Sequence, residues 1–381
     1  MLSNMNEEQE TIRAAVRRFA EAEIAPVSEA LWEGQLFPYE IWRKVCELGF
    51  TGLPYPEEYG GGGGSWVSFA IVLEELARID CAVANSIMAN STVASLITNF
   101  GTHAQKEQFL RPILDGRKIG CIGLTEPNAG SDAAGLQTRA VETKDGWVVN
   151  GSKIFISNSG NDVTGPVVIA AITGKKPDGR NEISNLIMPH GTPGFTYGGK
   201  LNKIGWRASS TYGLFFEDCR LPRQNLLGER GAGLRQTLAT INTGRILIGS
   251  MGLGILQGSL DRSVAYMKER KAFGKPIASF QALQFKIADM ATHAHGARLM
   301  LYHAAELKDQ GKPFDREASM AKLFATEKGM EAAHQAIQIH GGYGIMSDYA
   351  VSRAFGDAKV LEIVEGTSEI QRMIISRQLL S

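Results

Sequence analysis

The sequence lacks a net charge, a cysteine pattern suited to metal or redox chemistry, and a long apolar run. Its 381 residues include 40 Lys and Arg against 40 Asp and Glu, so the formal net charge is zero. Binding nucleic acid through phosphate neutralisation needs a basic surface, so this balance disfavours a nucleic-acid partner. The four cysteines form no CxxC pair, which favours reduced, buried thiols in a cytoplasmic protein. The seven histidines suggest no metal site either.

No apolar run reaches the roughly 18 residues that a membrane-spanning helix requires. The first ten residues are polar and acidic, without the basic start and apolar centre of a secretory signal. They also lack the arginines of a transit peptide, which a processed chain would have lost. We therefore expect no membrane partner and a cytoplasmic location, or the mitochondrial matrix if the chain is the processed form of a eukaryotic protein.

The hydrophobic pattern changes twice along the chain and predicts three domains, in keeping with its length. Residues 1–120 and 234–381 carry apolar residues at helical spacing, whereas residues 121–233 carry short apolar runs separated by Gly and Pro. We expect an α+β fold with an N-terminal α-helical domain, a middle antiparallel β domain and a C-terminal α-helical domain. The expected helices are 7–22, 41–48, 69–78, 86–100, 104–114, 234–270, 280–310 and 316–339, and the expected strands include 167–172, 183–188 and 211–216.

Residues 147–158 predict a β-hairpin. The sequence WVVNGSKIFISN has an apolar run on each side of Asn150-Gly151, the dipeptide most typical of two-residue hairpin turns. We therefore expect two short antiparallel strands in this segment, joined by that turn.

The run VEGTSEIQR at residues 364–372 is the most informative motif of the chain. It places a single carboxylate, Glu365, directly before a Gly-Thr turn in an otherwise helical stretch. A glutamate at a loop tip that faces a cavity can act as a general base, provided that burial raises its pKa from about 4.3. Taken alone, the motif fits equally an ordinary surface glutamate at a helix start, where the helix dipole favours a carboxylate.

Two further motifs lie upstream, LTEPNAGSD at residues 124–132 and RKAFG at residues 270–274. In the first, the Thr125 hydroxyl and the backbone amides of a glycine-containing turn can reach the polar edge of a heterocycle. The alternative is a capped turn in which Ser131 and Asp132 begin a short helix.

In this order and spacing, the three motifs resemble those of the acyl-CoA dehydrogenase family of flavoproteins, over essentially the whole chain. The resemblance implies FAD as cofactor, an acyl-CoA substrate and α,β-dehydrogenation to the 2-enoyl-CoA. Glu365 would remove the α-proton while the β-hydride passes to flavin N5, and a backbone N–H at Glu365 and a flavin hydroxyl would polarise the thioester carbonyl. Electrons would pass to electron-transferring flavoprotein. A C-terminal four-helix bundle and a homotetramer are also implied.

The resemblance implies two groups of FAD-binding residues. Those near the flavin ring are Leu124, Thr125, Gly130, Ser131, Phe155 and Ser157. Those on the adenine and pyrophosphate side are Arg270, Phe273, Gln281, Gln338, Gly341, Gly342, Thr367 and Glu369. Phe155 replaces the more common Trp and either stacks on the flavin or is an ordinary core residue. In the family the second group comes from a neighbouring subunit as well as from the same chain, and Gln is more common at position 369.

Substrate contacts are implied for a further set of residues: Ser131, Arg245, Ala84, Asn85, Met88, Val364 and Gly366. Some family members carry the base on the long central helix, just before an arginine. Here Gly244 precedes Arg245, so Glu365 is the one candidate that matches either pattern. Arg245 itself either lies near the substrate, as its counterpart does, or belongs to a buried structural ion pair.

Two substitutions bear on the acyl group. Val364 stands where many members have Tyr, which either leaves room for a branched or cyclic group or is filled by a neighbouring side chain. Ala84 occupies the position of the arginine that holds the substrate carboxylate in glutaryl-CoA dehydrogenases. An unpaired buried carboxylate is costly, so a dicarboxylic substrate is disfavoured. We expect a short or medium acyl chain, branched and cyclic chains included.

Two alternatives stay open at this point. A flavoenzyme of the same fold can catalyse another reaction, such as enoyl-CoA reduction, oxidation by oxygen, monooxygenation or desulfination. Most monooxygenases and desulfinases of this fold lack the glutamate of the EGT motif, so Glu365 counts against those two reactions. The oxidases usually have a longer C-terminal region. A non-enzymatic DNA-binding relative is disfavoured by the neutral charge.

Overall fold

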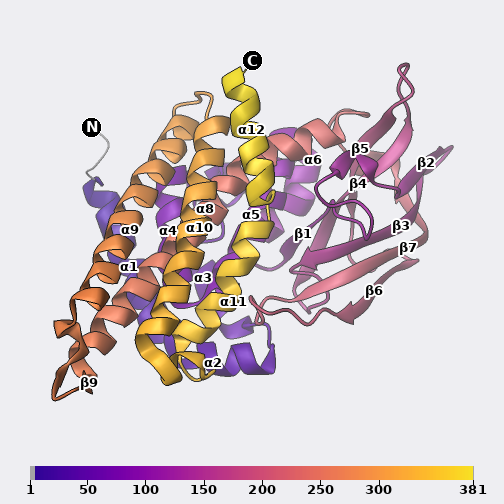
Figure 1. Cartoon of the computed structure of the whole chain (residues 1–381). Coiled ribbons are helices and arrows are strands. Elements are labelled where there is room, and N and C mark those ends of the chain that lie inside the picture. Colours follow the sequence, from indigo (N-terminus) through magenta and orange to yellow (C-terminus); the bar gives the residue numbers. More distant parts are fainter. Residues whose placement is uncertain (1–4, 381) are drawn as a thin grey trace.

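The computed structural model describes residues 5–380. Its sheet domain lies between two helical parts in the sequence, and in space it lies to one side of the helices, which pack together (Figure 1). Asn6 and Gln9 form a capping box at the start of the first helix, where three glutamates complement the helix dipole. The N-terminal helices are α1 (Glu7–Phe19), α2 (Ala25–Gly34), α3 (Tyr39–Glu47), α4 (Trp66–Ile79), α5 (Cys81–Phe100), α6 (His103–Gln105) and α7 (Arg111–Leu114). The predicted helix 104–114 is divided, because the π-helical turn Lys106–Leu110 separates α6 from α7.

Helices α4 and α5 are buried on almost all sides and form the centre of the N-terminal part. The carboxylate of Asp80 begins α5 by accepting hydrogen bonds from the backbone N–H groups of Ala82 and Val83. Within residues 5–380, α5 alone is long and apolar enough to cross a membrane, and 94% of that stretch is buried inside the protein. Helices that are apolar all round are typical of the core of a large domain as well as of membranes.

The middle part is one mixed sheet, with antiparallel pairs in the majority. Its strands are β1 (Ile119–Gly123), β2 (Arg139–Thr143), β3 (Gly146–Ser157), β4 (Thr164–Lys175), β5 (Asn181–Met188), β6 (Phe195–Lys200), β7 (Thr211–Pro222) and β8 (Leu226–Leu227). Their order is β6-β7-β3-β2-β4-β5-β8, with β1 paired to β4. The β1–β4 and β2–β4 pairs are parallel, which the expected all-antiparallel domain did not include.

The predicted hairpin at residues 147–158 is wrong. A single strand, β3, runs through Asn150 and Gly151 and pairs with β7 along its whole length. The Asn-Gly dipeptide lies at a bulge, where the register shifts between Val149 and Gly151. Gly151 has φ +144°, and a Cβ there would lie 2.6 Å from Thr138 Oγ1. The glycine therefore serves a bulge and a close contact instead of a turn.

The C-terminal part is the four-helix bundle that the resemblance implies, with a fifth helix packed on it. Its elements are α8 (Gly233–Glu269), α9 (Gln281–Asp309), α10 (Asp315–His340), α11 (Ala350–Ile363) and α12 (Ser368–Leu380), with the hairpin β9 (Lys271–Ala272) and β10 (Lys275–Pro276) between α8 and α9. The long helices α8, α9, α10 and α11 lie alongside one another, and α12 packs on α10 (Figure 1).

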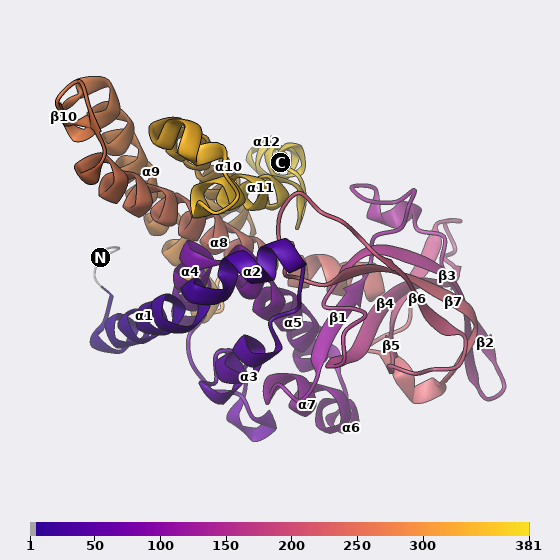
Figure 2. The same ribbon diagram turned by 90° about the horizontal axis from the view of Figure 1, so that it is seen from below.

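Helix α8 packs against both the N-terminal helices and the other helices of the C-terminal part. A Cβ on Gly252 would lie 3.0 Å from the carbonyl oxygen of Ala325 in α10, and one on Gly254 would lie 2.4 Å from that of Glu74 in α4. Backbones approach this closely only where no side chain intervenes. Helix α8 also contacts α5 and α11, and α5 packs on β1 beside the sheet (Figure 2). The candidate site forms where these elements meet.

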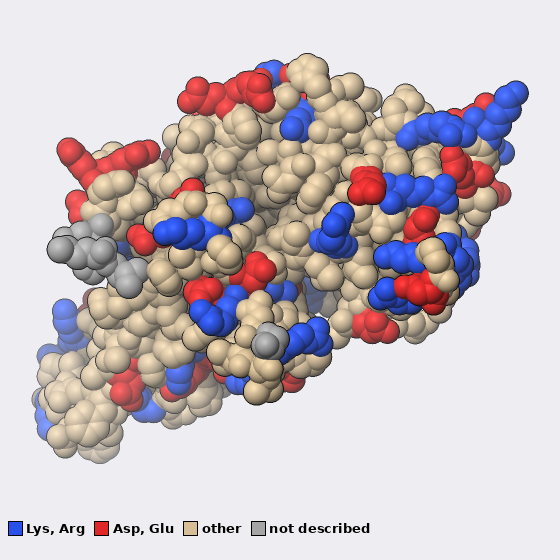
Figure 3. Space-filling view, turned by 90° about the horizontal axis from the view of Figure 1, so that it is seen from above, with Lys and Arg blue, Asp and Glu red and all other residues tan. Residues whose placement is uncertain are grey.

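The surface carries both signs of charge intermixed on the face shown in Figure 3. Of the four cysteines, Cys46 is half-buried, and Cys81, Cys121 and Cys219 are buried; none forms a disulfide. Within the described chain, no three His, Cys, Asp or Glu side chains are placed to share a metal ion.

Candidate active site

Glu365 lies in the four-residue connection 364–367 between α11 and α12. Its φ is +54°, a left-handed conformation that is uncommon outside glycine, and Gly366 follows with φ +93°. The side chain points at α8, because a Cβ built on Gly244 would lie 2.9 Å from the Glu365 carboxyl carbon. The two positions considered for the base therefore meet in space, and the absence of a side chain at residue 244 makes room for the carboxylate.

The Oε2 atom of Glu365 is out of contact with solvent. This atom has no hydrogen-bond partner within residues 5–380, although the residue as a whole is only partly buried. Burial raises the pKa of Glu365 to about 7, against the opposing effects of the cations Arg245 and Lys322. A buried carboxyl with a pKa near neutrality and a free oxygen can accept a proton from a bound molecule.

Arg245 lies one residue beyond Gly244 and is buried. Its Nη1 donates to Asn242 Oδ1 and to Ser319 Oγ, and its Nε has no partner in the described chain. No carboxylate of residues 5–380 comes within 4.0 Å of its guanidinium, so the alternative of a direct structural ion pair is wrong. Burial lowers the pKa of Arg245, while the charge of Glu365 acts in the opposite direction.

The residues predicted for the acyl group lie together. Ala84 and Met88 on α5 are buried in one apolar cluster with Trp206 and Ile248, and Val364 packs against that cluster. Val364 is partly buried by this packing. Asn85 is also buried, where its Nδ2 donates to Ser209 Oγ at 2.9 Å while Oδ1 has no partner among the described residues.

The residues predicted for the flavin ring lie on the sheet domain. Phe155 and Ser157 share one side of β3, opposite the buried Ile156, and the Phe155 side chain is 65% exposed. Phe155 has φ +62° at a register shift between β3 and β7, which turns its ring outward. The alternative of an ordinary core phenylalanine is wrong, and the exposed ring is a flat apolar platform.

The segment 124–132 follows β1 and is folded around a buried ion pair. The Glu126 carboxylate accepts from Lys153 Nζ at 2.7 Å and from the backbone N–H groups of Gln137 and Thr138 at 2.6 and 3.0 Å. Lys153 Nζ also donates to the Leu124 carbonyl at 3.2 Å. This pair fixes the loop from inside and leaves its outer side open.

The outer side of this loop carries three predicted residues. The carbonyl of Thr125 accepts from the Ile154 N–H at 3.0 Å, which ties the loop to β3 beside the Phe155 platform. Gly130 and Ser131 are exposed, and a Cβ on Gly130 would meet nothing within 4 Å. Only a three-residue 3-10 turn, Ala133–Gly135, follows, and no side chain caps it. The alternative of a capped turn that begins a helix at Ser131 and Asp132 is therefore wrong.

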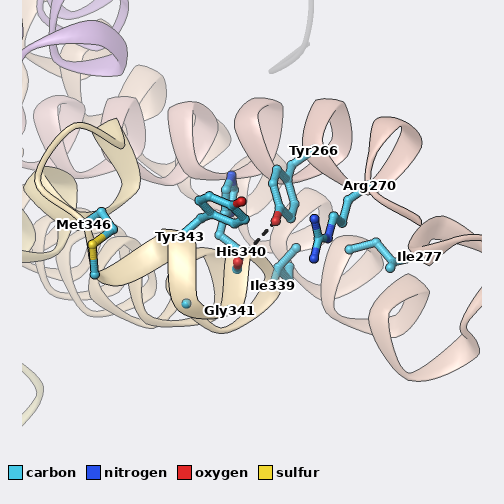
Figure 4. A pocket seen from close by; sticks show the side chains of 9 residues that line it. Tyr266, Arg270, Ile277, Ile339, His340, Gly341, Tyr343 and Met346 are labelled. Atoms are coloured by element: carbon cyan, nitrogen blue, oxygen red, sulfur yellow. Dashed lines mark hydrogen bonds between the residues drawn. The ribbon is translucent and has the colours of Figure 1, made fainter. Parts of the chain in front are cut away.

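The residues predicted for the adenine and pyrophosphate lie at the other end of α8. Arg270, Gly341 and Gly342 line a pocket of about 550 Å³. Figure 4 shows Tyr266 of α8 and Arg270 just after that helix facing His340, the last residue of α10, and Tyr343 in the turn that follows it. Tyr266 stacks on the His340 ring and donates to the His340 carbonyl at 3.3 Å. Gly341 ends α10 with φ +60°, and a Cβ on Gly342 would meet nothing within 4 Å.

Three other residues predicted for this group do not line the pocket but belong to the same end of the bundle. Phe273 is 94% exposed in the turn between β9 and β10, Gln281 begins α9, and Gln338 is exposed in the last turn of α10. Thr367 and Glu369 lie elsewhere, at the start of α12. The Thr367 hydroxyl accepts from the Ile370 N–H at 3.3 Å as a helix cap.

The Arg270 pocket is far from the predicted flavin-ring residues of the same chain, whereas Thr367 and Glu369 lie beside Glu365. Helix α8 continues from Gly244, which faces Glu365, to Glu269 beside the pocket, a distance of about 38 Å at the usual rise per residue. In Figure 1 the β9 end of the bundle and the sheet domain lie at opposite ends of the molecule. One extended dinucleotide cannot touch both the Arg270 pocket and the flavin-ring residues of the same chain.

Two buried side chains near Glu365 were not predicted. Lys322 of α10 and Gln371 of α12 both hydrogen-bond to the 364–367 connection and are fully buried. A signal for Lys322 was present in the sequence. It falls on the stripe of Ala318 and Ala325, which marks the buried side of α10.

Comparisons with known proteins cover the whole chain. Three family models match: the N-terminal domain of acyl-CoA dehydrogenase at residues 6–117, its middle domain at 121–219 and its C-terminal domain at 231–380. The probable acyl-CoA dehydrogenase YngJ of Bacillus subtilis is 48% identical over 99% of both chains. Butyryl-CoA dehydrogenase from Megasphaera elsdenii has a TM-score of 0.96 and 41% identity over 100% of both chains. A chain in a structure described as electron transferring flavoprotein of Acidaminococcus fermentans has a TM-score of 0.95 and 42% identity over 99% of both.

Proposed function

The chain belongs to the acyl-CoA dehydrogenase family of FAD-dependent oxidoreductases, and we propose that it oxidises short-chain acyl-CoA thioesters with Glu365 as the base. One observation supports this assignment above the others. The Oε2 atom of Glu365 is buried and unpaired in the described chain, and the carboxylate is directed at the bare backbone of Gly244. A carboxylate without a protein partner is costly unless a ligand uses it.

The residues present fit FAD at two places. The exposed Phe155 ring and the open side of the loop at Gly130 suit a flavin ring. The pocket of Arg270 and Gly342 suits phosphates, because it offers a cation and unobstructed backbone. When bound, FAD supplies the acceptor for a hydride from the β-carbon of the substrate.

The protein side of the reaction is the removal of the α-proton. With a pKa of about 7, Glu365 is ionised in a large fraction of molecules at neutral pH and still basic enough to take the proton. Its Oε2 has no competing hydrogen bond in the described chain. The C–H electron pair left at the α-carbon forms the new double bond as the β-hydride departs. The positive charges of Arg245 and Lys322 lower the pKa of Glu365 and so favour its ionised form.

A short acyl chain suits the apolar cluster beside Glu365. Ala84, Met88 and Val364 close this region with well-packed neighbours such as Trp206. A relative of 41% identity is named butyryl-CoA dehydrogenase. We propose a chain of about that length, with small branched chains as the next candidates. The apolar Ala84 leaves a distal carboxylate unpaired, so dicarboxylic substrates are excluded from the proposal.

We propose a homotetramer in which the Arg270 end of one chain completes the FAD site of another. The separation of the Arg270 pocket from the sheet-domain residues Phe155 and Gly130 supports an FAD site shared between two copies. Large apolar side chains are exposed at this end and along the outer helices: Phe273, Phe285, Ile345, Met346, Leu379 and Leu380. Such side chains are typical of a covered interface. Electron-transferring flavoprotein is the proposed electron acceptor, as a structural neighbour of 42% identity comes from a structure described by that name.

Anaerobic titration of the purified flavoprotein with a panel of saturated acyl-CoAs tests the function. We expect butyryl-CoA to bleach the long-wavelength absorbance of the flavin at near-stoichiometric amounts, and palmitoyl-CoA and glutaryl-CoA to leave it intact. A strong preference for palmitoyl-CoA would contradict the short-chain proposal. Failure of every saturated acyl-CoA to bleach the flavin would contradict dehydrogenation itself.

A further inference from the structure

The connection that carries Glu365 is held from two sides by two buried side chains, Lys322 and Gln371. From α10, Lys322 Nζ donates to the Gly366 carbonyl at 3.0 Å and to the Glu362 carbonyl at 3.3 Å. From α12, Gln371 Nε2 donates to the carbonyls of Glu365 and Gly366 at 3.0 and 2.8 Å. Both side chains have no exposed surface.

These contacts explain how an unfavourable backbone conformation is maintained. Two consecutive residues, Glu365 and Gly366, have positive φ, which is costly at a residue with a side chain. Their two carbonyls are the groups that Gln371 and Lys322 bind. A Cβ on Gly366 would lie 2.8 Å from Gln371 Nε2, so the glycine is what allows the amide to approach. The strained turn persists because buried donors hold it.

Lys322 also brings an unneutralised charge to the site. No carboxylate of residues 5–380 lies within 4.0 Å of its Nζ, although a buried ammonium is normally paired. Its nearest polar partners are the two backbone carbonyls. Burial lowers its pKa to about 8, while Glu365 exerts the largest opposing effect. Glu362 and Glu327 act in the same direction as Glu365, and Arg245 acts against them.

We propose that Lys322 and Gln371 are positioning residues for the base, an inference that rests on the proposed role of Glu365. Both fix the 364–367 connection so that the carboxylate points at Gly244. Lys322 in addition stabilises the ionised form of that carboxylate through its charge. The groups that face Glu365 are then Arg245 from α8 and Lys322 from α10, and only the second also holds the loop.

Replacement of Lys322 by Met keeps the apolar stem and removes the charge and both hydrogen bonds. We expect the rate of flavin reduction by butyryl-CoA to fall about 100-fold, the loss that a displacement of about 1 Å causes, with a smaller change in KM. The acid limb of the pH profile should move up by about 1 unit, because the loss of a nearby cation raises the pKa of a carboxylate. Lys322→Arg keeps the charge, so its acid limb should stay near that of the parent protein.

Lys328→Met is the matched control. Lys328 lies on the same helix and is partly exposed, where its Nζ pairs with Glu331 at 2.7 Å. We expect this variant to keep the parent rate and pH profile. If Lys322→Met also keeps both, the proposal is overturned.

Gln371→Met separates position from charge and serves where Lys322→Met fails to fold or to retain flavin. It removes the donors to Glu365 and Gly366 without changing any charge, so we expect a lower rate with an unmoved acid limb. A parent rate in this variant would overturn the positioning role.

Glu365→Gln separates the two proposals. If it keeps its rate, the proposed base is wrong; if it is inactive while the Lys322 and Gln371 variants are normal, only the positioning inference fails.

Discussion

Two buried lysines each anchor a loop of the proposed active site, and they are satisfied in different ways. Lys153 on β3 anchors the segment 124–132 and forms an ion pair of 2.7 Å with Glu126. Lys322 on α10 anchors the segment 364–367 through backbone carbonyls alone. Burial lowers the pKa of each to about 8. The positive charge of Lys153 is neutralised by its ion pair with Glu126. The positive charge of Lys322 has no paired carboxylate within 4.0 Å among residues 5–380, so it acts on the ionisation of Glu365.

The contrast assigns different roles to the two lysines: Lys153 shapes a loop, and Lys322 also affects the proposed base. A buried ion pair is well suited to shaping a loop, because neither charge reaches beyond its partner. A buried cation without a paired carboxylate is less stable and is found where its field is used. The two loops accordingly differ in what they present. The first offers open backbone and an aromatic platform at Phe155, and the second offers a single carboxylate at Glu365.

The largest expected loss of stability follows from removing the charge of Lys153. Lys153→Met leaves the buried Glu126 carboxylate with backbone donors only, and we expect a loss of about 3 kcal/mol in the free energy of unfolding. Flavin content should fall as the loop loosens. Lys322→Met strands no carboxylate, so we expect a loss of only about 1 kcal/mol. Thermal unfolding and flavin absorbance of both purified variants check this order. Equal stability losses would contradict the distinction between the two lysines.

The variant Glu365→Gln tests whether the carboxyl group near Lys322 titrates with a raised pKa, through the pH dependence of the free energy of unfolding. Glu365 has a pKa raised to about 7 in the fold against 4.5 for a free side chain, so the folded state binds more protons between those values. The free energy of unfolding of the parent protein should therefore fall as pH rises from about 4.5 to 7.

The side-chain amide of Glu365→Gln does not ionise, so this variant should not lose stability as the pH rises from about 4.5 to 7. We expect Glu365→Gln to be more stable than the parent by about 2–3 kcal/mol at pH 8, with the gain disappearing near pH 4. Melting temperatures at the two pH values measure it. A gain that is independent of pH would show that Glu365 does not titrate in this window.

A smaller effect is expected at Gly244, which faces the base. In Gly244→Ala the new Cβ would lie 2.9 Å from the Glu365 carboxyl carbon, so the carboxylate must shift. We expect about a tenfold loss in the rate of flavin reduction, a cost of about 1.4 kcal/mol in the transition state. Gly199→Ala in β6, where a Cβ also meets nothing within 4 Å, is the control and should leave the rate and the melting temperature unchanged. A parent rate in Gly244→Ala would place the working carboxylate elsewhere.

Local patterns in the sequence predicted much of this account. The domain order and the long helices followed from apolar periodicity, and the motif residues Glu365, Phe155 and Arg270 followed from the family resemblance. The Asn150-Gly151 hairpin failed because a turn dipeptide and a bulge have the same local signature. Only the pairing of β3 with β7 distinguishes them, and that partner lies some sixty residues along the chain.

Other features depend on contacts between distant residues. Gly244 and Glu365 occupy the two positions where family members carry the base, and their contact joins α8 to a loop that follows α11. Lys322 was visible as a charge on the buried stripe of α10, but its acceptors are 40 and 44 residues away. No single-sequence pattern encodes such a pair. Thr367 shows the reverse case, since its cap on α12 is a local bond that a propensity argument can find.

The most direct test measures the rate of flavin reduction by butyryl-CoA from pH 5 to pH 9 in the parent protein and in Glu365→Gln. The account predicts a parent rate that rises with pH through a midpoint near 7, the pKa of the buried carboxyl. It predicts that the variant loses about 10²- to 10⁴-fold in rate and has no such limb. A variant with a near-parental rate, or with the same limb at a lower rate, would contradict the claim that Glu365 is the base.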